Sequence, residues 1–137
     1  MNREEIKKII PHREPMLLVD EANVVDEKTA TGKYTVRGDE FFLQGHFPGN
    51  PVVPGVILCE MMAQTGAVIL ANRIKGATPY FTGLNNVKFR QKVVPGDTLD
   101  ITCQLTHERG NFFFAKAVGK VNGKLAVSAE FSFALVP

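Results

Sequence analysis

Residues 55–74, GVILCEMMAQTGAVILANRI, decide the fold of this chain. Drawn as an α-helix, this segment is apolar on nearly every face, and such a helix is either buried in a protein or spans a membrane. Glu60, Gln64 and Arg73 interrupt the apolar residues too often for a membrane span. The segment therefore predicts one buried helix, roughly 30 Å long at 1.5 Å per residue.

The other segments with a clear pattern are strand-like. Strands are expected at residues 16–25, 29–36, 80–94, 98–107, 112–121 and 125–136. Turn residues separate the last four of them, and Asn122-Gly123 is a strong hairpin signal. A short amphipathic helix over Ile6–Ile10 comes first and is ended by Pro11. Because the buried helix must be covered on most sides, an α+β fold is expected, with one antiparallel sheet wrapped around that helix.

Length and composition restrict the class of protein. The 137 residues, 45% of them hydrophobic, fit a single domain over residues 1–137. A net charge of +2 excludes a polybasic nucleic-acid binder. Cys59 and Cys103 are too few for a disulfide scaffold, and the first residues lack the apolar core of a signal peptide. We therefore expect a cytoplasmic protein with no nucleic-acid or membrane partner.

Common catalytic motifs do not occur in the sequence. There is no Gly-rich phosphate loop, no His-Glu-x-x-His, no Gly-x-Ser-x-Gly and no His/Cys cluster with metal-ligand spacing. The sequence therefore predicts neither a metal nor a cofactor. Cys59 lies beside Glu60 and could be a nucleophile, but a packed small apolar residue is the better interpretation.

Residues 46–60, HFPGNPVVPGVILCE, combine the parts of an acid–base site. Glu60 lies in a helix built for burial, and burial favours the neutral carboxylic acid, which suits a general acid. Gln64 is on the same face at i+4 and could hold that carboxyl group. The free backbone N–H groups of Gly55 and Val56 at the helix start could bind an oxyanion. With His46 as base, these parts suit removal of a proton α to a carbonyl and loss of a β leaving group.

Simpler interpretations stand beside this one. Pro48-x-x-Pro51-x-x-Pro54 is also a polyproline ligand pattern, although it leads straight into a buried helix. Taken singly, His46 reads as an ordinary loop histidine and Glu60 as a satisfied buried polar group. The residues alone favour a catalytic role for this segment and leave the alternatives open.

In this segment the sequence resembles a known family. The run His46-Phe47-Pro48-Gly49-x-Pro51-x-x-Pro54-Gly55-Val56, followed by Glu60-x-Met62-Ala63-Gln64, resembles the (3R)-hydroxyacyl-acyl-carrier-protein dehydratases of bacterial type II fatty acid synthesis. The similarity extends over nearly the whole chain, through residues 10–13, 15–20, 87–90 and 94–97. Met61, Ile57 and Glu14 depart from the usual residues, and none of them touches the proposed chemistry.

The resemblance implies a hot-dog fold, in which an antiparallel sheet wraps one long helix. It implies His46 and Glu60 as the catalytic pair, drawn from different subunits, and the Gly55 amide as the donor to the substrate carbonyl. It further implies acyl carrier protein as partner and homodimers assembled into a trimer of dimers. The related dehydratase–isomerase branch generally has Asp where Glu60 stands, which argues against that branch without excluding isomerase activity.

Some candidates lie outside the central motif. Tyr80 and Phe81 could gate the mouth of an acyl tunnel, and ordinary strand packing explains them equally well. His12 and His107 are interpreted as structural or solvated.

Lys88, Arg90 and Lys92 recur at period two, which would place three cations on one strand face. An acidic carrier protein could dock there; the alternative is a strand edge protected by charge.

The sequence is also compatible with two rival functions. One is a hot-dog thioesterase, in which an acid or water attacks the thioester carbonyl, and the other is a non-catalytic acyl-binding domain. Retention of both His46 and Glu60 speaks against the second. The acyl chain length depends on how the tunnel packs and is not predicted.

Overall fold

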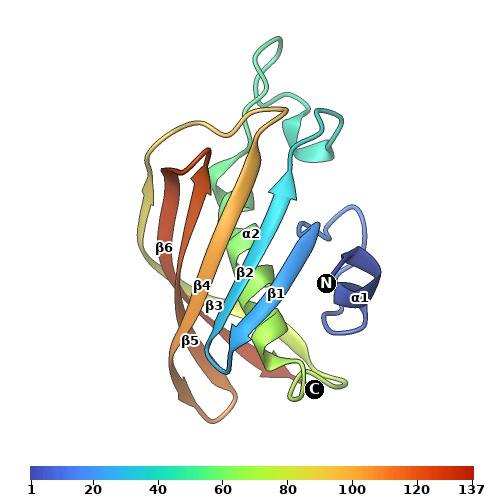
Figure 1. Cartoon of the computed structure of the whole chain (residues 1–137), viewed down its shortest axis with the longest axis vertical. Helices are drawn as coiled ribbons and strands as arrows, with labels where there is room; N and C mark the ends of the chain where they lie inside the picture. The colour runs from blue at the N-terminus through green and yellow to red at the C-terminus, as the bar shows by residue number, and fades with distance from the viewer.

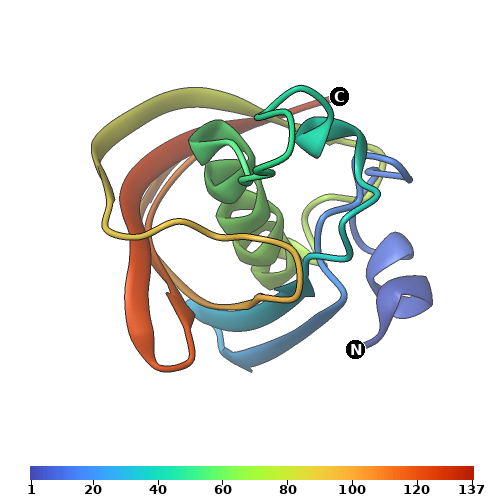
Figure 2. The same ribbon diagram turned by 90° about the horizontal axis from the view of Figure 1, so that it is seen from above.

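A computed structural model describes residues 1–137, and its six strands form one antiparallel sheet that curls around a central helix (Figures 1 and 2). The strand order is β1-β2-β4-β5-β6-β3. In chain order the elements are α1 (Arg3–Lys7), β1 (Glu21–Asp26), β2 (Thr29–Thr35), η1 (Phe41–Leu43), α2 (Gly55–Ala67), η2 (Val68–Leu70), β3 (Thr78–Phe89), β4 (Thr98–Arg109), β5 (Phe112–Val121) and β6 (Lys124–Val136). The predicted α+β architecture, a sheet wrapped around one helix, is confirmed.

The central helix α2 is shorter than the apolar pattern predicts. It starts at Gly55 as expected, but regular α-helix ends at Ala67 and the next turn tightens into the 3-10 segment η2. The expected continuation to Ile74 is therefore wrong. Apolar side chains continue through this turn because it is still buried, as Val68 and Leu70 show. No helix of the structure has both the length and the apolar character needed to cross a membrane.

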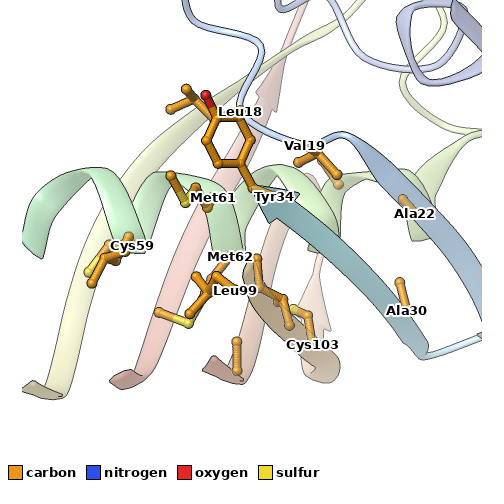
Figure 3. Packing of buried hydrophobic residues seen from close by; sticks show 14 of the residues in the cluster. Leu18, Val19, Ala22, Ala30, Tyr34, Cys59, Met61, Met62, Leu99 and Cys103 are labelled. Atoms are coloured by element: carbon orange, nitrogen blue, oxygen red, sulfur yellow. The ribbon is translucent and has the colours of Figure 1, made fainter. Parts of the chain in front are cut away.

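The core lies between α2 and the inner face of the sheet. Figure 3 shows Met62 on α2 pointing toward Leu99 and Cys103 on β4, and all three side chains are buried. Gly66 allows this close contact, because a Cβ atom at that position would lie 2.7 Å from the Cys103 sulfur. The helix is thus held close against the sheet, which fixes the positions of the side chains on its other faces.

The predicted first strand begins later than expected. Leu17, Leu18 and Val19 are buried, yet their segment is irregular, and β1 starts only at Glu21. Their apolar pattern comes from packing into the core rather than from strand pairing. The backbone of this segment remains available for other hydrogen bonds, which matters at the site described below.

The strand β3 forms one edge of the sheet, with β6 as its only neighbour. Tyr80, Leu84 and Phe89 on this strand are all substantially exposed, Tyr80 by 57%. An exposed edge with apolar side chains is a template for pairing with another chain. The backbone of this edge is therefore available for pairing with another strand.

Candidate active site

Glu60 and Gln64 lie one turn apart on the same face of α2. The Gln64 Nε2 group donates a hydrogen bond of 2.8 Å to Glu60 Oε2, which is the contact that the i+4 spacing predicts. Gln64 is only 1% exposed, whereas the Glu60 side chain is 20% exposed. Glu60 is thus largely but not completely buried, and its face of the helix borders a small cavity.

That cavity has a volume of about 30 Å³, enough for one water molecule. Its walls come from α2, from the edge strand β3, from β6 and from the irregular segment before β1. The lining residues are His12, Glu60, Ala63, Gln64, Ala67, Pro79, Phe81 and Phe133. Glu60 therefore faces a small pocket whose walls combine polar, small and aromatic side chains.

The two gate candidates occupy different places. Phe81 forms part of the pocket wall, in edge-on contact with Phe131. Tyr80 is the adjacent residue of the same strand, is more exposed and does not line the pocket. Neighbouring side chains of a strand point to opposite faces of the sheet, so only Phe81 faces the inside.

His12 is the residue that sequence reasoning missed. Its Nε2 atom lies 3.5 Å from Glu60 Oε2, and its Nδ1 atom is buried without a hydrogen-bond partner. The structure thus places His12 against the carboxyl group instead of in a purely structural or solvated position. The motif Ile10-Pro11-His12-Arg13, already part of the family resemblance, was the signal that could have identified it. His107 is exposed on β4, as expected for a solvated histidine.

The N-terminus of α2 offers free backbone donors. Pro54 provides no side-chain cap, and the first amides bonded in this turn are those of Ile57 and Leu58, both donating to Pro54 O at 3.0 and 3.3 Å. The amides of Gly55 and Val56 precede them and point out of the helix end. They are suitably placed to stabilise a negative oxygen.

The absence of a side chain at Gly55 shapes this end of the helix. A Cβ atom there would lie 2.6 Å from Cζ of Phe89, the last residue of β3. The glycine therefore lets the aromatic ring pack directly against the first turn. The edge strand β3 thus touches the site twice, through Phe81 at the pocket and through Phe89 at the helix start.

His46 lies in the Pro/Gly loop before α2. Its Nδ1 atom is 2.9 Å from the carbonyl oxygen of Val52, and its ring stacks on Phe47. A carbonyl oxygen only accepts hydrogen bonds, so Nδ1 carries the proton and the Nε2 lone pair remains free. A neutral histidine in this tautomer can act as a base through Nε2.

Within one chain, the structure does not bring His46 to Glu60. His46 is not among the residues that line the Glu60 pocket. Its loop, teal in Figure 1, projects past the end of the sheet. The chain by itself assembles Glu60, Gln64 and His12, and leaves the half-buried His46 outside this group.

The predicted strand face with three cations does not form, because β3 ends at Phe89 and only Lys88 of the three lies within it. Lys88 and Arg90 line a groove of about 480 Å³ on the outer face of the sheet, together with Lys116 of β5. The amides of Arg90 and Gln91 both converge on the Ala126 carbonyl, at 2.7 and 3.4 Å, so regular pairing stops there. The period-two alternation is lost at that point, and Lys92 lies outside the groove.

Both cysteines are unpaired and belong to the core. Cys59 is 2% exposed and Cys103 is fully buried. Burial raises the pKa of the Cys103 thiol to about 12 and also raises that of Cys59. The thiolate is the reactive form, so neither residue is suited to nucleophilic chemistry near neutral pH.

We expect iodoacetamide to leave the native protein unmodified at pH 7.5 and to leave its catalytic activity unchanged. Both cysteines should become alkylated once the chain is unfolded in guanidinium, which mass spectrometry can count. Alkylation of Cys59 in the native state, with parallel loss of turnover, would contradict this interpretation and restore Cys59 as a candidate nucleophile.

Comparisons with known proteins identify the family of this chain. Residues 10–130 match the family model of the FabA-like domain. The chain is 45% identical to the 3-hydroxyacyl-acyl-carrier-protein dehydratase FabZ of Clostridium perfringens strain SM101, over 98% of this chain and 99% of that protein. It is 48% identical to the FabZ of Clostridium botulinum strain Kyoto, over 96% of this chain and 93% of that protein.

Solved structures show the same fold at low sequence identity. The dehydratase heterocomplex ApeI:P from Xenorhabdus doucetiae superimposes with a TM-score of 0.83 at 22% identity, over 96% of this chain and 91% of the matched chain. A hypothetical thioesterase from Streptococcus pneumoniae, solved with coenzyme A, gives a TM-score of 0.63 at 15% identity, over 85% and 84% of the two chains. The shared fold therefore does not separate dehydratases from thioesterases, whereas the sequence does. The chain belongs to the FabA-like family and, within it, to the 3-hydroxyacyl-acyl-carrier-protein dehydratases of the FabZ type.

Proposed function

We propose that this chain removes water from (3R)-hydroxyacyl thioesters of acyl carrier protein and forms trans-2-enoyl thioesters for fatty acid synthesis. The observation that carries the proposal is the Glu60 carboxyl group, which Gln64 holds at a pocket one helical turn from free backbone amides. The similarity to FabZ dehydratases over nearly the full chain supports the same reaction. Two unpaired cysteines favour a reducing compartment, and we place the reaction in the cytoplasm.

The proposed mechanism uses three groups. The free Nε2 atom of His46 removes the α proton, and the resulting enolate oxygen is stabilised by the amide of Gly55, with Val56 beside it. Glu60 then protonates the β hydroxyl group, which leaves as water while the enolate collapses to the double bond. Gln64 donates to Oε2 of Glu60, so Oε2 acts as the carbonyl oxygen of the acid and the transferable proton resides on Oε1.

The site is completed by a second copy of the chain. His46 does not line the Glu60 pocket of its own chain, and the exposed edge of β3 borders both that pocket and the helix start. Pairing of two β3 edges around a two-fold axis would bring the partner's His46 loop to this edge. We propose a homodimer with two shared sites, and a trimer of such dimers as the family resemblance implies.

A direct assay separates this function from its rivals. The protein is incubated with 3-hydroxyacyl carrier protein and, separately, with trans-2-enoyl carrier protein, and the acyl group is followed by mass. Loss and gain of one water, with the thioester intact, is the expected result. Release of the free acid would indicate a thioesterase, and an unchanged acyl group would indicate a binding domain.

The outer-face groove is the proposed docking surface for the carrier. Lys88 and Arg90 flank Phe89, whose ring contacts Gly55, so the groove lies on the other side of the strand that covers the site. The charged side chains that line the groove are three cations, Lys88, Arg90 and Lys116, and one carboxylate, Glu130. An acidic carrier docked there would be attracted by this excess positive charge.

Reversing Lys88 and Arg90 to Glu should raise KM for carrier-bound substrate about tenfold and weaken its dependence on salt, because charge pairs of this kind mainly steer association. Turnover of a small thioester analogue should not change. Lys92→Glu is the control, a charge reversal outside the groove that equals each single replacement within it, and should leave KM nearly unaltered. Equal losses on both substrates would mean damage to the fold and would contradict docking at this groove.

A further inference from the structure

A chain of hydrogen bonds connects Glu60 to the N-terminal helix, and Gln64 is its central link. The Gln64 Oε1 atom accepts from the Leu18 N–H at 2.8 Å, and Nε2 donates to Met16 O and to Glu60 Oε2, both at 2.8 Å. Rotating the side-chain amide of Gln64 by half a turn would place its NH₂ group against the Leu18 N–H. Its oxygen would then face the oxygens of Met16 and Glu60. Since Gln64 is buried, water cannot replace these partners. The backbone at Met16 and Leu18 therefore dictates how Gln64 presents its donor to Glu60.

That backbone segment is irregular, and besides the core packing of its side chains it is bonded by Arg3. The carbonyl of Leu17, between the two residues that bind Gln64, accepts from Arg3 Nη2 at 2.9 Å. The Nη1 group of the same guanidinium pairs with Asp20 Oδ1 at 2.8 Å. Asp20 Oδ2 in turn accepts from the Thr35 N–H at the end of β2, at 2.8 Å. Arg3 thus joins α1, the irregular segment and the sheet through one rigid fork.

We propose that Arg3 is a positioning residue for the general acid, a role that rests on the proposed function of Glu60. Without the guanidinium, the Leu17 carbonyl loses its charged donor and the Met16–Leu18 backbone is free to shift. Gln64 then follows its two backbone partners, and its bond to Glu60 Oε2 lengthens or breaks. Without that hydrogen bond, the acidic proton of Glu60 can reside on either carboxyl oxygen. It is then no longer held on Oε1, the atom that faces the substrate in the proposed mechanism.

The first test is the replacement Arg3→Met, which keeps most of the side-chain volume and removes every donor. We expect kcat for dehydration to fall about tenfold, less than the hundredfold that a displacement of 1 Å can cost. KM for carrier-bound substrate should stay the same, because Arg3 does not line the Glu60 pocket and only the proton-transfer step should be affected. Arg3→Lys retains one charged donor without the fork, so it should recover part of kcat.

A double-mutant cycle shows whether Arg3 acts through Glu60. In the background of Glu60→Gln, which has no acid to position, Arg3→Met should lower kcat no further. Arg73→Met is the matched control, since it removes another arginine ion pair, with Glu108, in the segment that follows η2. Arg73→Met should leave kcat unchanged, both in the wild-type protein and in the Glu60→Gln background.

The outcomes separate the two proposals. If wild-type protein does not dehydrate the substrate, the proposed function fails. If wild-type protein is active and folded Arg3→Met has the same kcat, or lowers it equally in both backgrounds, the positioning role of Arg3 is overturned. Circular dichroism and thermal unfolding establish folding, and if Arg3→Met does not fold, Arg3→Lys takes its place in the cycle under the same criteria.

Discussion

Replacing Glu60 by Gln is expected to lower the turnover of dehydration at least ~100-fold, within the range attributed to general acid catalysis. The amide has nearly the same shape as the carboxyl group, and its oxygen can still accept the hydrogen bond from Gln64 Nε2. It cannot deliver a proton to the departing hydroxyl group. The loss should therefore appear in kcat, measured with 3-hydroxyacyl carrier protein, whereas KM stays close to its wild-type value.

The control for this prediction is Glu108→Gln, the same chemical change at an exposed carboxylate paired with Arg73. It should leave kcat unchanged, and thermal unfolding of both variants should show that each is folded. Near-wild-type turnover of folded Glu60→Gln would remove Glu60 from the mechanism. Loss of activity in both variants would mean that the assay responds to stability instead of acid catalysis.

Much of the fold could be predicted because its signals are local. The apolar residues of α2 recur on all faces over consecutive turns, and the strands are separated by turn residues such as Asn122-Gly123. The end of α2 and the start of β1 were misjudged for a common reason. Burial produces apolar residues in a 3-10 turn at Val68–Leu70, and in an irregular segment at Leu17–Val19, as readily as in regular elements.

The contacts of the candidate site were also predictable only in part. The pair Glu60 and Gln64 could be predicted because the i+4 spacing on one helix places their side chains together. His12 reaches Glu60 from a distant irregular segment, and no periodicity encodes that contact. The hydrogen bonds from Gln64 to Met16 and Leu18 were likewise invisible, since they use backbone groups that every sequence has.

The second large effect concerns the two chains that we propose to share each site. Dimers of His46→Ala alone, or of Glu60→Ala alone, should be inactive because every site carries one lesion. Co-expression of the two variants should restore roughly a quarter of wild-type sites under random pairing. In a mixed dimer one site combines both lesions, and the other combines the intact His46 of one chain with the intact Glu60 of its partner.

A cis arrangement of the same lesions provides the matched control. When the double variant His46→Ala, Glu60→Ala is co-expressed with wild-type chain, shared sites in a mixed dimer each carry one lesion, and only wild-type dimers are active, again roughly a quarter of all sites. Sites confined to one chain would instead give about half the activity in the cis mixture and none in the trans mixture. The structure favours the shared arrangement, because His46 does not line the Glu60 pocket of its own chain while the β3 edge beside that pocket is unpaired. An inactive trans mixture, with mixed dimers verified by native mass spectrometry, would show instead that the loop folds back onto its own helix.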